Sequence, residues 1–253
     1  MKNTIKSTLL ASVLGLLALP AALNAQVLVE SVVAGNPTFD DPADTGTFAF
    51  DASGSNYILV AASSRNSVDS ATYNGAPMTQ IHLFNDSGQN EGFGIWGLAN
   101  PTAGSNDVVI QYASGSPDGR NVVAVYGLSN VDTSIGGSLI DNNNNGDSVS
   151  GNPTLAGASL FGFAGTNGGS DVTSFTITGG TASNEIFQEN TTSIGGSAVL
   201  STSTATTYTF DANTGDYGAL VQVAAIPEPS TAALLLGVGA FAFLLSNRRR
   251  RAA

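Results

Sequence analysis

Short apolar runs, each ended within a few residues by glycine, asparagine, aspartate, serine or proline, restrict the fold of this sequence more than any other feature. Between residues 26 and 226 no window shows apolar residues at the 3.6-residue spacing of an amphipathic helix. Ten or more such runs, separated by turn residues, predict an all-β fold. We expect a single antiparallel β-sandwich of jelly-roll-like form over residues 26–225.

Two of these runs carry the clearest local signals. Residues 57–62 are apolar without interruption, which predicts a strand buried on both faces. Asn74-Gly75 lies between 72–73 and 78–84 and predicts a β-hairpin. The other predicted strands begin with the runs around 27–33 and 48–50 and continue with 93–98, 108–112, 122–128, 155–163, 172–178, 185–188, 198–201, 206–210 and 217–223.

Composition excludes several classes of function. The sequence has no cysteine, so disulfides, zinc–thiolate sites and thiol catalysis are absent. Residues 26–226 contain 18 acidic side chains and two basic ones, Arg65 and Arg120, which gives a formal charge of −16. A nucleic-acid surface needs clustered lysine and arginine, so we expect no nucleic-acid partner.

The N-terminus has the three parts of a secretory signal peptide. Lys2 and Lys6 form a positive start, and residues 8–19 are an apolar run of signal-peptide length. Pro20 ends that run, and small residues follow up to Ala25. We expect a signal helix within residues 1–25, with cleavage after Ala25.

The C-terminus is a second targeting segment. Pro227, Glu228 and Pro229 cannot continue a helix or a central strand, so the folded body should stop near Ala225. The apolar run 231–245 predicts a helix of about 22 Å, which approaches the roughly 30 Å hydrocarbon core once flanking residues are added. The basic residues that follow stay on the cytoplasmic side and leave the body outside; they are Arg248, Arg249, Arg250 and Arg251.

A Pro-Glu-Pro box, an apolar helix and an arginine cluster, in that order, resemble the PEP-CTERM protein-sorting signal of Gram-negative bacteria. The box is formed by Pro227, Glu228, Pro229 and Ser230 within residues 226–253. The resemblance implies that a membrane-embedded exosortase is the partner and cuts near the box. It also implies export across the inner membrane, transient anchoring in that membrane, and release to the cell envelope, outer surface or extracellular matrix. A plain C-terminal anchor with a basic stop fits the hydropathy equally well.

The body carries a weaker resemblance. The runs 57–62, 71–79, 95–101 and 123–128 are similar to the opening strands of a β-sandwich domain found in large exported bacterial proteins. The shared residues are turn and core residues, so this resemblance implies a fold and no activity.

Residues for catalysis are sparse, and we expect no catalytic residue. His82, the only histidine, lies in the apolar run 78–84, and no Gly-x-Ser-x-Gly elbow accompanies it. A glycosidase needs two convergent carboxylates, and the body's glutamates are Glu30, Glu91, Glu185 and Glu189. Trp96 with Phe93 could form a sugar-stacking platform, although aromatic residues within an apolar strand are more often core.

One segment has the spacing of half a calcium loop. Oxygen-bearing side chains that could hold Ca²⁺ are Asp141, Asn143, Asn145 and Asp147, with Gly146 at the sixth position. Position twelve is Asn152, where the pattern needs a bidentate glutamate. The alternative is a solvated asparagine-rich loop between strands, with no cofactor at all.

Together these features predict an exported, non-enzymatic surface or matrix protein, sorted by an exosortase and associated with exopolysaccharide or biofilm. The alternative is a carbohydrate-binding module or a polysaccharide-active enzyme, with extracellular polysaccharide as its partner.

Overall fold

The computed structural model describes residues 26–40, 45–86, 91–112, 121–144, 146, 148–155, 157–167, 172, 175–179, 183–189, 192–199, 202–212 and 217–226. The chain divides into two compact units, Gln26–Ile226 and a second made of Met1–Ala25 with Pro227–Ala253; all of these described residues belong to the first. The predicted signal peptide, sorting box, apolar helix and arginine cluster therefore lie outside them. Within the described ranges there is no helix of the length and apolar character that crossing a bilayer requires.

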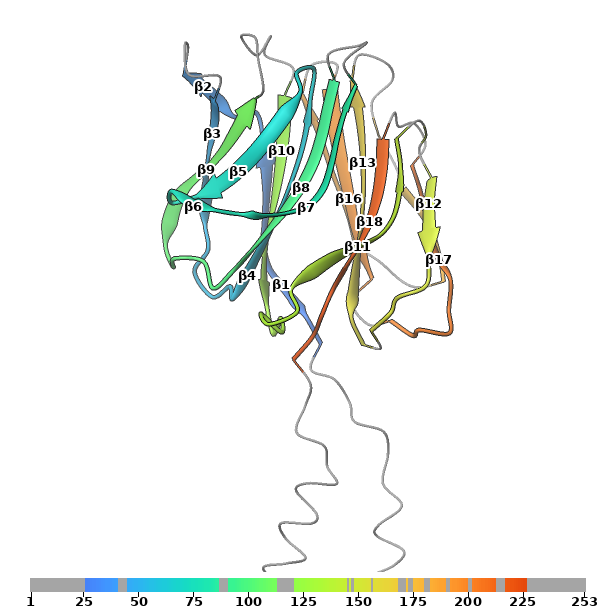
Figure 1. Cartoon of the computed structure of the whole chain (residues 1–253). Coiled ribbons are helices and arrows are strands. Elements are labelled where there is room, and N and C mark those ends of the chain that lie inside the picture. Colours follow the sequence, from blue (N-terminus) through green and yellow to red (C-terminus); the bar gives the residue numbers. More distant parts are fainter. Residues whose placement is uncertain are drawn as a thin grey trace, which may run out of the picture. The chain divides into compact units, whose positions relative to one another are not determined.

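Four antiparallel sheets build the body (Figure 1). The first inner sheet has the order β1 (Leu28–Gly35), β10 (Asn121–Ser129), β4 (Tyr57–Ser64), β8 (Glu91–Ala99) and β7 (Thr79–Asp86). The first outer sheet has the order β2 (Thr38–Asp40), β3 (Thr45–Asp51), β9 (Ser105–Tyr112), β5 (Val68–Tyr73) and β6 (Ala76–Pro77).

The second half of the chain supplies the other two sheets. The second inner sheet has the order β11 (Gly137–Asn143), β18 (Tyr217–Val223), β13 (Ser159–Asn167), β16 (Thr192–Val199) and β15 (Ser183–Glu189). The second outer sheet has the order β12 (Ser148–Gly151), β17 (Tyr208–Ala212) and β14 (Phe175–Thr178). The all-β, antiparallel, sandwich-like prediction is confirmed for the described residues.

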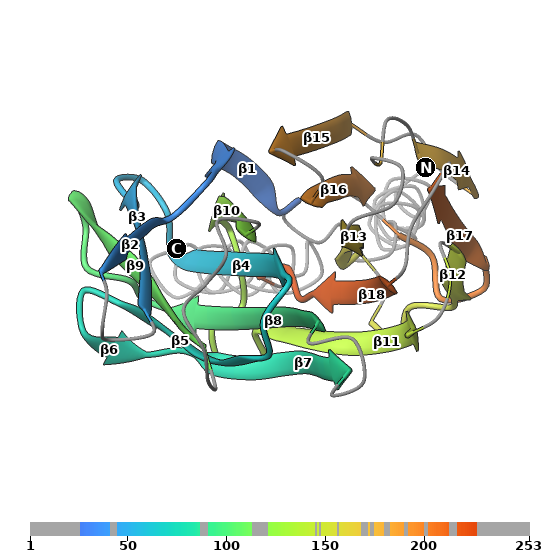
Figure 2. The same cartoon turned by 90° about the horizontal axis from the view of Figure 1, so that it is seen from above.

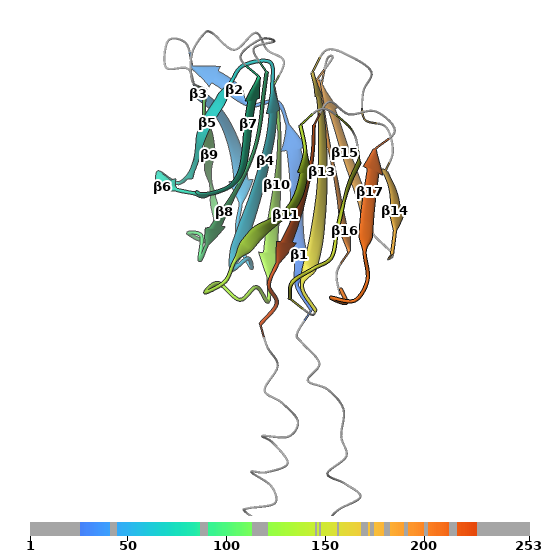
Figure 3. The ribbon, with the colours of Figure 1, turned by 45° about the vertical axis from the view of Figure 1, so that its right-hand side comes forward.

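The four sheets are stacked, with the two inner sheets face to face in the middle (Figures 2 and 3). On β4, Ile58, Val60 and Ala62 face the first outer sheet, whereas Tyr57, Leu59 and Ala61 face the second inner sheet. Every residue of β4 is buried, because sheets cover both of its faces. Further along the stack, Leu220 of β18 and Phe210 of β17 belong to a third core.

The two halves have the same topology. In chain order, β1, β3, β4, β5, β7, β8, β9 and β10 correspond to β11, β12, β13, β14, β15, β16, β17 and β18. The inner sheets then have identical strand orders, and β3-β9-β5 in the first outer sheet matches β12-β17-β14 in the second. The body is therefore a tandem pair of sandwiches, whereas the strand pattern predicted a single one.

The halves pack as a pseudo-symmetric pair. Strand β7 contacts β11, and β1 contacts β15, so each edge strand of one inner sheet lies beside an edge strand of the other (Figure 2). Under the correspondence above, these two contacts are equivalent, which is the pattern of an isologous interface. Because this interface buries Tyr126 of β10 against Phe161 and Phe163 of β13, the two sandwiches share one core.

Local sequence explains the tightest turn. Asn74 and Gly75 connect β5 to β6 with φ of 49° and 74°, both in the left-handed region. That geometry is typical of a type I′ turn and favours Asn-Gly, so the predicted turn is confirmed. The strand that pairs with 72–73 is β6, whereas the predicted partner run 78–84 lies mostly in β7, which pairs with β8 in the other sheet.

Candidate functional site

The two ends of the described chain meet at one residue, Asn130. The side-chain Nδ2 of Asn130 donates a hydrogen bond to the carbonyl oxygen of Gln26 over 3.2 Å. The backbone N–H of Ile226 donates to the carbonyl oxygen of Asn130 over 2.9 Å. Asn130 has φ of 58°, a left-handed conformation that asparagine tolerates better than most residues. The body therefore begins and ends at the same point.

The residues beside Asn130 hold the last strand end in place. Val131 and Ala225 form an antiparallel bridge, and the N–H of Asp132 donates to the carbonyl of Ala224 over 2.9 Å. The Asn56 side chain binds the backbone of Val131 twice, accepting its N–H over 3.2 Å and donating to its carbonyl over 2.8 Å. The chain is thus hydrogen-bonded up to Ile226, the residue immediately before Pro227.

We call the meeting point of Gln26, Asn130 and Ile226 the chain exit; it was not among the sites predicted from the sequence. The proline box alone predicted that the body ends near Ala225. Asn130 follows β10 directly and takes a positive φ, as Asn74 and Asn100 also do after strands. An asparagine directly after a predicted strand was the available signal. Its partners Gln26 and Ile226 are about a hundred residues away on either side, so nothing local identified them.

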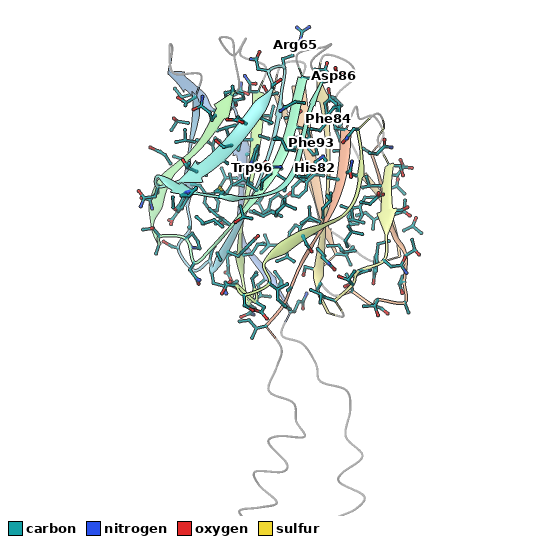
Figure 4. The ribbon with its side chains drawn as sticks, viewed as in Figure 1. Arg65, His82, Phe84, Asp86, Phe93 and Trp96 are labelled. Atoms are coloured by element: carbon teal, nitrogen blue, oxygen red, sulfur yellow. The ribbon has the colours of Figure 1, made fainter. Side chains whose placement is uncertain are left out.

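His82 lies in β7 at the seam between the two sandwiches (Figure 4). It is 7% exposed, its ring packs against Phe93 at a centroid distance of 5.8 Å, and the Asn144 side chain is a hydrogen-bond partner. Burial lowers the pKa of His82, and the Asn144 hydrogen bond opposes part of that shift. Phe93 in turn stacks on Tyr217 at 6.0 Å, so His82 adjoins an aromatic cluster of the shared core. The interpretation of His82 as a half-buried strand residue is thus confirmed for the strand, and its side chain is more deeply buried than expected.

Trp96 and Phe93 do not form a platform. Both lie in β8 but three residues apart, so their side chains leave opposite faces of the strand. Trp96 is 1% exposed in the core between the first outer and inner sheets, and Phe93 is fully buried between the two inner sheets. The sugar-stacking hypothesis for this pair is wrong, and the core interpretation is confirmed.

Two of the four glutamates considered for glycosidase chemistry lie far apart. Glu30 lies at the bulge of β1 between Val29 and Ser31, whose partners in β10 are level, across β4, with Ala99 and Leu98 of β8. Glu91 starts β8 at the other end. Seven residues of strand, about 23 Å, separate those levels, well beyond the carboxylate spacing of a glycosidase pair. Glu185 and Glu189 both lie in β15, and only their backbone is described.

The half calcium loop is partly a strand. Asp141 and Asn143 belong to β11, opposite Leu220 and Gly218 of β18, while Asn145 and Asp147 lie outside the described residues. Oδ2 of Asp141 accepts the N–H of Ser150 over 2.9 Å, and Nδ2 of Asn143 donates to the carbonyl of Ser148 over 3.2 Å. The prediction of a continuous loop over 141–147 is therefore wrong for 141–143, because β18 provides their backbone partners. In the described part of the chain, no group of three or more histidine, aspartate or glutamate side chains could hold a metal ion.

Comparison with known proteins gives one informative match. Residues 225–250 match the family described as the PEP-CTERM protein-sorting motif. No curated protein matches the chain. Among solved structures, the extracellular domain of ANXUR2 from Arabidopsis thaliana is similar at 8% identity and a TM-score of 0.27, over 81% of this chain and 93% of that one. A likeness that weak carries no argument about fold or function.

Proposed function

We propose that this protein is an exported exosortase substrate whose body is released from the membrane by a cut near Pro227, Glu228 and Pro229. The match of residues 225–250 to the PEP-CTERM protein-sorting motif carries the proposal. That motif implies export, transient membrane anchoring at the C-terminus and processing by an exosortase. All of the motif's parts are features of a substrate, so this chain supplies no catalytic residue to the cut.

The chain exit supports this function. The body is hydrogen-bonded up to Ile226, and Pro227 follows with no spacer. Proline has no N–H and cannot extend the backbone pairing of Ala225 with Val131. The box therefore starts where the backbone pairing of the body ends. A body whose hydrogen bonding ends at Ile226 should remain intact after a cut at the box.

For the released body we propose a non-enzymatic role on the cell surface or in an extracellular matrix that contains exopolysaccharide. Three of the side chains considered for chemistry are placed unfavourably: His82 is buried at the seam, and Glu30 and Glu91 lie at opposite ends of one sheet. A formal charge of −16 over residues 26–226 keeps such a body soluble. Binding to a glycan array without turnover would indicate a carbohydrate-binding module, and release of reducing sugar would indicate an enzyme.

Two isogenic hosts, with and without an active exosortase, test the sorting function. We expect full-length protein in the inner membrane when the exosortase is absent, and a shorter body in the envelope or medium when it is present. A chain truncated after Ile226 is the matched control, and it should be exported in both hosts. Identical fractionation of the full-length chain in the two hosts would refute the proposal.

A further inference from the structure

Three exposed apolar residues belong to the segments that meet at the chain exit. The large hydrophobic residues that the described structure leaves exposed are Leu28 (44%), Val33 (41%), Ile135 (52%) and Ile226 (42%). Leu28, Ile135 and Ile226 belong to three segments, 26–28, 130–136 and 224–226, which backbone and side-chain hydrogen bonds tie together at Asn130 and Asp132. We call this surface the exit face.

The exit face has no basic side chain. Its one carboxylate, Asp132, accepts a hydrogen bond from the Ser134 hydroxyl, and Glu30, two residues beyond Leu28, accepts one from the Ser129 hydroxyl. Of the two cations in residues 26–226, Arg65 follows Ser64, at the opposite end of β4 from Tyr57, and Arg120 lies outside the described residues. Tyr57 pairs with Leu128, next to the exit face, so Arg65 is far from it. An apolar surface with partnered carboxylates fits an apolar or zwitterionic partner and not an anionic one.

The short connection between Ile226 and the apolar run of the tail favours a lipid surface as that partner. The apolar run of the tail starts at Thr231, five residues after Ile226. Fully extended, five residues span at most about 18 Å, less than the thickness of a bilayer. While the run 231–245 is inserted, the exit face is therefore confined close to the lipid surface. This confinement raises the effective concentration of lipid surface at the exit face, so a weak apolar attraction is enough to keep the two in contact.

We propose that, before the sorting cut, the exit face rests on the zwitterionic lipid surface through Leu28, Ile135 and Ile226. This inference rests on the proposed function, because it requires an inserted tail. The contact places the Pro-Glu-Pro box at the level of the lipid headgroups. After the cut the tether is lost, the three side chains are too few to retain the body, and the body leaves the membrane.

The absence of cysteine from the chain makes a direct test straightforward. The full-length chain with Ile135→Cys carries an environment-sensitive fluorophore and is reconstituted into phosphatidylcholine–phosphatidylethanolamine vesicles that contain a spin-labelled quencher lipid. Val33→Cys is the matched control, because Val33 is similarly exposed but lies five residues along β1 from Leu28. We expect at least a two-fold stronger quenching of the label at position 135 than at position 33.

A second variant tests the apolar nature of the contact. Leu28→Asp and Ile226→Asp, added to the labelled Ile135→Cys chain, should remove the excess quenching while the protein stays vesicle-bound. Equal quenching at positions 135 and 33 in vesicle-bound protein would overturn the proposed contact and leave the sorting function standing. Protein that fails to float with the vesicles would instead refute the membrane anchoring on which the sorting function depends.

Discussion

Gly196 provides the sharpest test of how the two sandwiches fit together. It lies in β16, and a Cβ atom added there would be 2.1 Å from the hydroxyl oxygen of Tyr126 and 3.3 Å from Cε1 of Phe163. Tyr126 is 2% exposed and packs edge-on against Phe161 and Phe163, with centroid distances of 5.6 and 5.7 Å, so its ring has little room to move. The Gly196→Ala substitution should therefore overpack the shared core.

The expected magnitude follows from two opposing contributions. Overpacking a filled core costs about 1–3 kcal/mol of unfolding free energy. Replacing glycine by alanine within a strand returns roughly 0.5–1 kcal/mol through backbone entropy. The difference is about 0–2.5 kcal/mol. Because the added Cβ would lie 2.1 Å from the Tyr126 hydroxyl, we expect a net loss of about 1–2 kcal/mol, which for a unit of this size lowers the melting temperature by roughly 2–8 °C. Circular dichroism melting of the mature body measures this change.

A double mutant separates steric overlap from other effects of the alanine. Tyr126→Phe removes the atom at 2.1 Å and leaves the ring carbon Cζ at 3.1 Å, a distance that a shift of a few tenths of an ångström relieves. The double mutant should therefore recover about 1 kcal/mol relative to the sum of the single mutants. A Gly196→Ala body that melts at or above the wild-type temperature would refute the packing described for the interface.

Three further outcomes are expected for the isolated body. Burial lowers the pKa of His82 below 6.5, so near and below that pH the unfolded protein binds more protons than the folded protein. The free energy of unfolding should therefore fall as the pH drops from 7 to 5, and His82→Gln should make that fall smaller. Urea titrations at a series of pH values measure both effects. Gly75→Ala should cost about 1 kcal/mol at the φ of 74°, whereas Asn74→Gly should be nearly neutral, and parallel thermal melts compare them. Millimolar calcium should leave the melting temperature unchanged. Asp141→Ala should lower the melting temperature with or without calcium, because it removes the hydrogen bond that the Ser150 N–H donates to Asp141. A saturable rise with calcium that Asp141→Ala abolishes would establish a calcium site.

Local signals in the sequence predicted the elements that depend on neighbouring residues. The apolar run 57–62 became β4, buried on both faces, and Asn74-Gly75 became the hairpin turn. Period-two alternation also determines the relative placement of Phe93 and Trp96. Phe93 and Trp96 are separated by an odd number of residues, which places them on opposite faces of any regular strand.

Long-range pairing could not be predicted from these patterns. The tandem topology depends on contacts such as β1 with β10, whose residues are about a hundred positions apart. The asparagine-rich segment after Leu139 has loop composition, yet β11 extends to Asn143 because Gly218 of β18 lies opposite. Asn130 likewise gains its role from Gln26 and Ile226, which only the closed fold brings to it.

The length of the mature protein tests the sorting account most directly. Intact mass spectrometry of the protein from a host with an active exosortase should give a body that lacks residues 234–245. Replacing Pro227, Glu228 and Pro229 together with alanine should leave membrane insertion intact and trap the full-length form in the membrane, because the apolar run and the arginines remain. Mature wild-type protein that still carries residues 234–245 would show that the tail is an anchor and contradict the account.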